Sequence, residues 1–333
     1  MNAWDIFGHD WAVEMLLQHV RQGALRHAYL FTGPAGIGRR SLALRLAQAI
    51  QCPTPRAPGV PCRTCRTCQQ IEAGQQIDLM ITQAESEGGT LKVEQVREVT
   101  KFLALKPYQS SFKIVLFLRF QEANASAQNA LLKTLEEAPP YALLMLTADT
   151  AEQLLPTIVS RCEVMRLRPV RAAALTEFLT AKGLPSESAQ LLGHLSGGRP
   201  GYALRLATEE NALAFRHEKL DELLELLNAS LRTRFAYAER LAKEKDAFRQ
   251  ALLVWLSFWR DVLLRVAGSN APLTNPDRAT DIEWLSEHLT FSQARLLTEQ
   301  TEQAIERLEK NVNARLLAEV TVMDWPKIKR ALP

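Results

Sequence analysis

Lys113-Ile-Val-Leu-Phe-Leu118 and Asn129-Ala-Leu-Leu-Lys-Thr-Leu-Glu-Glu137 are the two runs that decide the fold of this chain. The first holds five consecutive apolar residues, which suits a strand covered on both faces, as in a parallel sheet. The second lies in a helix whose apolar residues recur on one face, and Pro139-Pro140 ends that helix. Apolar runs at 142–146 and 164–167 follow. The order of strand, helix, strand, helix and strand predicts βαβ units of an α/β fold.

The end of the strand at 114–118 carries no acidic residue. A P-loop ATPase places an Asp for magnesium and an acidic base at such strand ends. Here the two positions are Leu118 and Arg119. The sequence therefore predicts a sheet of the P-loop type without its hydrolytic carboxylates.

A glycine-rich loop follows the predicted strand at 28–31. It reads Gly33-Pro-Ala-Gly-Ile-Gly-Arg-Arg-Ser41, with its glycines at Gly33, Gly36 and Gly38, and it leads into a helix. Strand, glycine loop and helix form the context in which backbone N–H groups bind phosphates. Arg39 stands where the phosphate-binding Lys belongs, and Arg40 stands where a hydroxyl should bind magnesium. Arg can still pair with phosphate, but its planar group is bulkier than an ammonium.

Three interpretations of this loop remain open at the sequence level. It is a structural relic without productive nucleotide, a site that binds nucleotide without hydrolysis, or a working ATPase that uses Ser41. The missing acids at 118 and 119 disfavour the third interpretation.

Four of the five cysteines lie close together in the sequence, as Cys52, Cys62, Cys65 and Cys68. Four thiolates can complete a tetrahedral zinc site with no open position, so the spacing predicts structural zinc rather than a catalytic metal. The alternative is four free thiols in a proline-rich loop. Basic residues at 56, 63 and 66 are either solvated or contact DNA or a partner.

Composition indicates an ordinary globular protein of two or three domains. The chain has 333 residues, of which 47% are hydrophobic and 23% charged, and a formal charge of +3. That charge is too small to predict nucleic-acid binding by itself. With no signal sequence, no apolar run long enough for a membrane and clustered cysteines, we expect a cytoplasmic protein.

The helix Asn129–Glu137 together with Ser160-Arg161-Cys162 resembles the AAA+ clamp-loader subunits of bacterial DNA polymerase III. The missing acids make the chain resemble the delta-prime type rather than the gamma/tau motor. This resemblance implies the AAA+ strand order and a four-cysteine module between the P-loop helix and the second strand. It also implies that neighbouring subunits, rather than this chain, bind most of the ATP.

Arg161 is the candidate catalytic residue. The resemblance implies that it projects into the ATP site of the adjacent motor subunit and offsets charge on the γ-phosphate, as an arginine finger. The alternative is an ordinary ion pair with a carboxylate on its own surface. The sensor arginine of active AAA+ proteins is also displaced here, because Gly201 takes its position and Arg199 precedes it by two residues.

The expected fold is an AAA+-type α/β domain with a five-stranded parallel sheet and a zinc insertion, followed by a helical lid and a helical collar domain. The three parts are 1–168, with the zinc module at about 52–68, then 169–207 and 208–333. Expected partners are the gamma/tau ATPase subunits and the delta subunit, with the sliding clamp and primed DNA reached through the complex. Rival interpretations are an active gamma-like ATPase and a zinc-dependent nucleic-acid-binding module. No segment resembles a polymerase active site.

Overall fold

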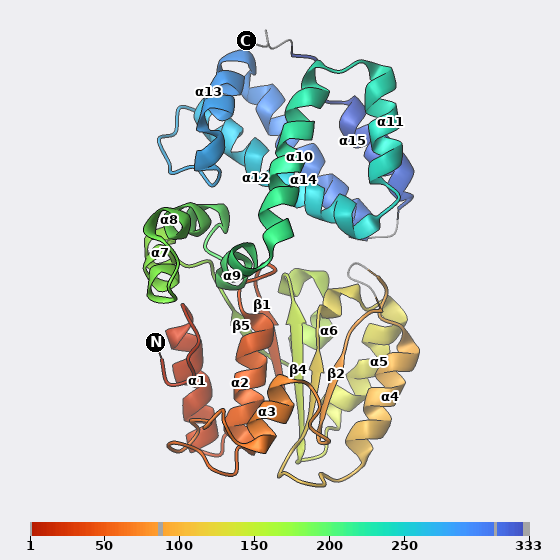
Figure 1. The fold of residues 1–333 in the computed structure, drawn as a ribbon. Helices are drawn as coiled ribbons and strands as arrows, with labels where there is room; N and C mark the ends of the chain where they lie inside the picture. The colour runs from red at the N-terminus through yellow and green to blue at the C-terminus, as the bar shows by residue number, and fades with distance from the viewer. Residues whose placement is uncertain (1, 86–88, 310–311, 329–333) are drawn as a thin grey trace. The chain divides into compact units, whose positions relative to one another are not determined.

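The computed structural model describes residues 2–85, 89–309 and 312–328. These residues form two compact units (Figure 1). The α/β unit comprises the chain through Arg171 together with Gly198–Tyr202, and the helical unit comprises Ala172–Gly197 and the residues from Ala203 on. Among the described residues, no helix is both long enough and apolar enough to cross a membrane.

The α/β unit is built on one parallel sheet of five strands, in the order β2-β3-β4-β1-β5. Each pair is parallel, and in the central pair Ile114 of β3 lies opposite Leu143 of β4. Because all four pairs are parallel, each connection between paired strands must cross over one face of the sheet. The strands are β1 (Ala28–Thr32), β2 (Leu79–Thr82), β3 (Lys113–Phe117), β4 (Ala142–Ala148) and β5 (Glu163–Arg166).

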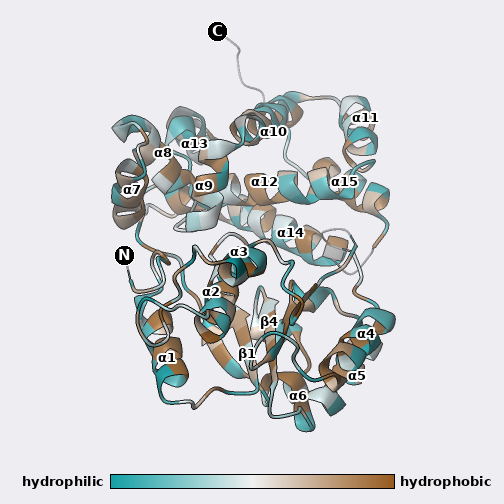
Figure 2. Cartoon of the chain, turned by 60° about the horizontal axis from the view of Figure 1, so that its bottom comes forward, coloured by the Kyte–Doolittle hydropathy of each residue, from teal (hydrophilic) through white to brown (hydrophobic). Residues whose placement is uncertain are grey.

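Helices cover both faces of this sheet, as the apolar strands require. Alternate residues of β1 serve different cores, since Tyr29 and Phe31 belong to one and Leu30 to the other. Figure 2 shows hydrophobic residues along the strands, and both hydrophobic and hydrophilic residues on the surrounding helices. The helices of the first core are α1 (Asp10–Arg21), α2 (Arg39–Gln51) and α3 (Arg66–Glu72), and those of the second are α4 (Val93–Ala104), α5 (Ala125–Glu136) and α6 (Pro156–Val159).

Helix α5 ends before Pro139-Pro140, as its sequence predicts, and its start is capped. The side chain of Asn124 accepts a hydrogen bond from the N–H of Ala127 and caps the helix start. Leu131 and Leu135 are buried four residues apart, as an amphipathic helix requires. The helical pattern predicts that Gln128 faces solvent, but it is buried. Its amide donates to the carbonyl of Ala123 and accepts from the N–H of Leu155, so it joins α5 to the segment before α6.

The strands predicted at 28–31, 114–118, 142–146 and 164–167 are confirmed, with ends displaced by at most two residues, and β2 completes the five-stranded sheet. The strand predicted at 114–118 ends at Phe117, because Arg119 adopts a left-handed backbone conformation with φ of 51°. That turn leads into the short 3-10 helix η1 (Phe120–Glu122), and a second, η2 (Ala151–Gln153), follows β4.

The helical unit packs around tryptophans. Trp255 and Trp259 are fully buried, so they are core residues and offer no platform for stacking bases. Its described residues contain no strand. The helices are α7 (Ala172–Ala181), α8 (Ser186–Leu195), most of α9 (Pro200–Thr208), α10 (Glu210–Asn228), α11 (Leu231–Leu241), α12 (Lys245–Val266), α13 (Ala279–His288), α14 (Phe291–Glu309) and α15 (Ala314–Met323), with the 3-10 helix η3 (Pro276–Arg278) before α13.

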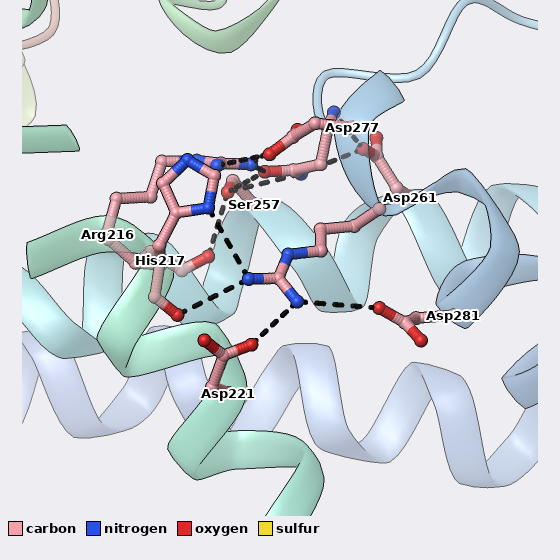
Figure 3. A network of polar contacts seen from close by, with 10 residues as sticks. Arg216, His217, Asp221, Ser257, Asp261, Asp277 and Asp281 are labelled. Atoms are coloured by element: carbon pink, nitrogen blue, oxygen red, sulfur yellow. Dashed lines mark hydrogen bonds and ion pairs between the residues drawn. The ribbon is translucent and has the colours of Figure 1, made fainter. Parts of the chain in front are cut away.

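A buried polar network fastens the loop after α12 within the helical unit (Figure 3). Arg216 of α10 makes two hydrogen bonds to the carboxylate of Asp277, at 2.7 and 2.9 Å, and a third to Asn275 at 2.7 Å. Asp261 of α12, which is fully buried, accepts from the N–H groups of Thr274 and Asn275. A loop that would otherwise leave polar groups unpaired is therefore held by charged side chains.

The predicted lid helices α7 and α8 belong to the helical unit, whereas residues 198–202, which contain the start of α9, belong to the α/β unit. The three-part division at 168 and 207 stays a prediction. Residue 1 and residues 329–333, at the outer ends of that division, lie outside the described residues.

Candidate functional site

The glycine loop lies at the carboxyl end of β1, where a P-loop is expected, but the start of α9 packs directly against it. The carbonyl of Gly36 accepts a hydrogen bond of 2.8 Å from the N–H of Gly201. Gly36 has a φ of +81°, and a Cβ at this position would lie 2.9 Å from Cβ of Tyr202. Only glycine fits this close approach. The hydrogen bond from Gly201 also ties the glycine loop to the start of α9.

Arg39 occupies the position of the P-loop lysine and forms an internal ion pair. Its side chain is 8% exposed, and Nη1 lies 2.7 Å from Oδ1 of Asp149. Asp149 directly follows β4, the neighbour of β1, and its carbonyl accepts from the N–H of Gly33. The positive charge that would face a phosphate is therefore balanced by a carboxylate of the same chain.

Arg40 and Ser41 lie in the first turn of α2, and both are exposed. The side chain of Arg40 has no oxygen with which to bind magnesium, as the sequence predicts. The hydroxyl of Ser41 is one residue beyond the usual position of the magnesium ligand. This turn consequently offers no hydroxyl at the expected place.

The end of β3 carries an ion pair instead of a magnesium ligand. Nε of Arg119 lies 2.8 Å from Oε1 of Glu122, and the N–H of Arg119 donates to Oγ1 of Thr147. Leu118 is partly buried against the first core. The positions that bind metal and activate water in an ATPase thus hold an apolar side chain and a cation.

Arg199, the displaced candidate for a sensor, stacks on an aromatic ring. Its guanidinium carbon lies 4.4 Å from the ring centre of Tyr202, within the range of a cation–π contact. Gly197 and Gly198, both with positive φ, end the preceding helix region, and Pro200 begins α9. The local sequence is accounted for by a helix end, a helix start and this contact.

Arg161 lies between α6 and β5, away from the glycine loop in the sequence and at the surface. Its Nη2 makes an ion pair of 2.6 Å with Oε1 of Glu136, and its side chain is 35% exposed. Nη1 donates to the carbonyl of Thr157 at 2.8 Å. The adjacent Cys162 packs against the second core, and burial raises the pKa of its thiol to about 12. The contact with Glu136 is the ordinary surface ion pair that the sequence leaves open as an alternative.

The four predicted cysteine ligands come together in space. The sulfur atoms of Cys52, Cys62, Cys65 and Cys68 all lie within 4.8 Å of one another, and those of Cys52 and Cys62 are 3.5 Å apart. A tetrahedral zinc site with Zn–S bonds of about 2.3 Å needs sulfur atoms about 3.8 Å apart, so the cluster is close to that geometry. No other such group of potential metal ligands occurs among the described residues.

Backbone donors support the negative charge of these sulfur atoms. The N–H groups of Cys62, Cys65 and Cys68 point to the sulfur atoms of Cys52, Cys62 and Cys65, at 3.3 to 3.4 Å. Hydrogen bonds from Thr54 and from the backbone lower the pKa of the Cys62 thiol to about 5. A metal ion takes thiolates rather than thiols. Burial raises the pKa of the Cys52 and Cys68 thiols, so a metal ion would have to displace their protons.

The four-cysteine module is fastened to the P-loop helix. Gln48 of α2 donates to the carbonyl of Cys68 at 2.7 Å, and Arg45 of α2 pairs with Glu72 of α3. The indole N–H of Trp4 donates to the carbonyl of Gly59 at 2.8 Å. The module is therefore part of the α/β unit rather than a separate appendage.

Two of the three arginines of the module have contacts within the chain. Arg56 donates to the carbonyl of Cys62, and Arg63 pairs with Asp5 at 2.7 Å. Arg66 is exposed at the start of α3. Arg56 and Arg63 are therefore engaged by groups of the same chain, and their presence does not require contact with DNA.

The structure thus pairs Arg39 with Asp149 and places the four cysteines next to one another. Arg161 pairs with Glu136 and contacts neither group. Sequence reasoning missed Asp149, Glu136 and Tyr202. For Asp149 a signal existed, because the carboxyl ends of adjacent parallel strands meet at one edge of the sheet. For Glu136 and Tyr202 no local pattern indicates the contact.

A five-stranded parallel sheet in this order, a glycine loop after β1 and a helical remainder define the AAA+ class of P-loop proteins, here with degraded nucleotide-handling residues. The sequence model of the family described as DNA polymerase III, delta subunit, matches residues 8–171. A second model, for the C-terminal part of the delta subunit, matches residues 210–327. The chain belongs to the delta-prime family of subunits of the bacterial DNA polymerase III clamp loader.

Two delta' subunits match this chain over almost its whole length. The chain is 33% identical to DNA polymerase III subunit delta' of Pseudomonas aeruginosa over 312 residues, 91% of this chain and 92% of the relative. It is 28% identical to the delta' subunit of Bacillus subtilis over 318 residues, 93% and 94% of the two chains. The chain is 29% identical to subunit tau/gamma of Haemophilus influenzae over 214 residues, which cover 63% of this chain and 30% of the relative. A solved gamma-subunit-related protein of Thermotoga maritima has a TM-score of 0.40 and 16% identity, over 94% of this chain and 97% of that chain.

Proposed function

We propose that this chain is the non-hydrolysing subunit of its clamp loader and that it supplies Arg161 to the ATP site of an adjacent gamma/tau subunit. In this proposal the motor subunits bind ATP, and the delta subunit, the sliding clamp and primed DNA are reached through the complex. The chain's own phosphate loop has a structural role. The chain instead controls ATP hydrolysis by the neighbouring subunit.

The observation that carries the non-hydrolysing part is the ion pair between Arg39 and Asp149. A nucleotide would have to displace this pair and the packing of Gly201 and Tyr202 on Gly36. Even then it would find no carboxylate at positions 118 and 119 and no hydroxyl at position 40. Without these groups magnesium lacks its usual protein ligands and the attacking water lacks its usual base.

The observation that supports the finger is the exposure of Arg161 on a surface turn, in a motif that resembles that of clamp loaders. Its pair with Glu136 is solvent-exposed on both sides, with 35% and 49% of the two side chains accessible. Such pairs contribute only about 0 to 1 kcal/mol, so a phosphate with more negative charge can compete for the guanidinium. The surface pair therefore does not conflict with a role in trans.

Structural zinc is the cofactor that the cysteine cluster fits. Cys52, Cys62, Cys65 and Cys68 would hold the ion, which would cross-link the loop after α2 to α3 and leave no position open for water. Its contribution would be to folding of the module and not to chemistry at ATP.

A reconstituted loader tests the finger. We expect Arg161→Ala to leave assembly intact and to slow DNA-stimulated hydrolysis at the adjoining ATP site by roughly 10³ or more, the range that fingers contribute in other phosphoryl-transfer enzymes. The measurement is rapid-quench hydrolysis at saturating ATP, with assembly checked by size-exclusion chromatography.

The matched control is Arg166→Ala, which removes an exposed arginine with only a loose ion pair to Glu152 at 3.9 Å. That variant should hydrolyse at the wild-type rate. An Arg161→Ala loader that assembles fully and hydrolyses at the wild-type rate would disprove the finger.

A further inference from the structure

Glu136 holds Arg161 in a defined orientation at the surface of the α/β unit. It is the last residue of α5, and its Oε1 lies 2.6 Å from Nη2 of Arg161. On the other side of the guanidinium, Nη1 donates to the carbonyl of Thr157 at 2.8 Å and lies 3.5 Å from Oγ of Ser160. The guanidinium is therefore fixed from two directions, by a charge on α5 and by the end of α6.

These contacts leave part of the guanidinium available. An arginine has five N–H groups, and the contacts within the described residues use two on Nη1 and one on Nη2. The Nε–H and the second N–H of Nη2 remain for oxygen atoms outside the chain. Guanidinium groups bind phosphate through pairs of N–H groups of this kind.

We propose that Glu136 is the positioning residue for the Arg161 finger, which orients the guanidinium before the neighbouring ATP site forms. This inference rests on the proposed function of Arg161. A long arginine side chain loses much rotamer freedom when it is immobilised at an interface. Glu136 and Thr157 impose that loss already in the free subunit, so less of it remains for the step at which the finger meets phosphate.

The weakness of the pair suits this role. An exposed pair orients a side chain without holding it against a stronger anion. Glu136 therefore differs from a latch, because the Nε–H and the second N–H of Nη2 can meet phosphate while the pair with Glu136 persists. The two roles predict opposite signs, because removal of a latch accelerates hydrolysis and removal of a positioning residue slows it.

The experiment uses the reconstituted loader with Glu136→Ala, Glu136→Gln and Glu137→Ala. Single-turnover hydrolysis at the adjoining site should fall by about two- to fivefold in Glu136→Ala, the rate equivalent of a weak ion pair. Glu136→Gln keeps an oxygen that can accept from Nη2, so it should retain more of the rate. Glu137→Ala, which removes the neighbouring exposed carboxylate, should have no effect.

Two further measurements separate positioning from damage to the fold. The affinity of the loader for ATP should be unchanged in Glu136→Ala, because only the chemical step depends on the finger. In an Arg161→Ala background, Glu136→Ala should cause no additional loss, because its effect passes through Arg161.

An unchanged or increased rate in Glu136→Ala, or an equal loss in both backgrounds, would overturn the positioning role. Failure of the proposed function gives a different result. If Arg161→Ala itself has no effect, the finger is wrong, whereas a slow Arg161→Ala loader beside a normal Glu136→Ala loader refutes the inference about Glu136 alone.

Discussion

Arg39 illustrates what a sequence does and does not disclose about a single residue. The absence of a P-loop lysine is visible from position 39 alone, and so is the loss of a hydroxyl at position 40. The partner of Arg39 is not, because Asp149 lies far along the chain and reaches Arg39 only through the pairing of β1 with β4. The residue type at position 39 predicts the loss of the usual phosphate-binding lysine. The fold determines that Arg39 pairs with Asp149 instead.

Gln128 and Glu136 also show that a sequence pattern does not determine a residue's contacts. Both follow from the periodicity of α5 as outward-facing residues, and Glu136 is exposed while Gln128 is buried. Periodicity describes which side of a helix faces the sheet, but the segment before α6 covers part of the other side. A polar residue there can be buried if its amide satisfies backbone groups, as Gln128 does for Ala123 and Leu155.

Asp78 gives a pH-dependent contribution to stability. It is fully buried, and although burial alone would raise its pKa, hydrogen bonds from the N–H groups of Tyr108 and Gln109 and from Lys113 lower the pKa of Asp78 overall. A carboxyl group with a lowered pKa in the folded state stabilises the protein above its unfolded pKa of about 3.9 and loses that contribution as the pH falls further.

We therefore expect the free energy of unfolding to fall as the pH is lowered through about 4, and to fall less steeply in Asp78→Asn. Urea unfolding at several pH values measures this difference. Glu14→Gln, at an exposed carboxyl group of α1, is the matched control and should follow the wild-type curve. A wild-type acid dependence in Asp78→Asn would rule out this carboxylate as its source.

At the scale of elements, the insertion between α2 and β2 is the segment whose folding we expect to depend on zinc. The loop from Cys52 to Cys65 has no helix or strand of its own and is held by its cysteines, by Trp4 and by Arg63. The spacing of the cysteines predicts the cluster, because two-residue gaps bring neighbouring sulfur atoms onto one ion. That α3 packs on the P-loop helix could not be predicted, since it depends on Gln48, Arg45 and Glu72.

Elemental analysis of the purified chain should find about one zinc ion per molecule. Cys68→Ser should lose the metal and make the segment at 52–75 sensitive to protease, because Cys68 is fully buried where the module meets α2. Cys162→Ser, at the fifth cysteine, should keep the metal. A folded, metal-free preparation with the same resistance to protease would show that the module does not depend on zinc.

The loop between α12 and α13 depends on buried charges in a comparable way. We expect Asp277→Asn to destabilise the helical unit by about 3 kcal/mol, because it leaves the buried guanidinium of Arg216 without a balancing charge. Glu299→Gln breaks the exposed pair with Arg295 and should cost less than about 1 kcal/mol. Urea unfolding monitored by tryptophan fluorescence compares the two variants, and equal losses would contradict the assigned importance of the network.

At the scale of the whole molecule, the order of elements along the chain could be predicted more fully than their grouping in space. Apolar runs and glycine loops indicate strands and their connections, but the strand order came from a resemblance and not from spacing. The grouping of α7 and α8 with the later helices, and of residues 198–202 with the sheet, follows from tertiary contacts that no local pattern contains.

The family, the ion pair of Arg39 with Asp149 and the exposed Arg161 support our proposal that the subunit keeps a nucleotide-binding architecture while its own phosphate loop has a structural role. Chemistry between subunits would explain both the loss of functional groups at residues 39, 40, 118 and 119 and the presence of a surface arginine at position 161. This is the central claim, and it separates the chain from an active motor of the same class.

The most direct test is release of labelled phosphate from magnesium–ATP by the isolated chain at saturating nucleotide. We predict no release above a sample without protein, and the same result for Arg39→Ala, because Arg39 is engaged with Asp149 and the metal lacks its usual protein ligands. Magnesium-dependent release that Arg39→Ala abolishes would contradict the central claim.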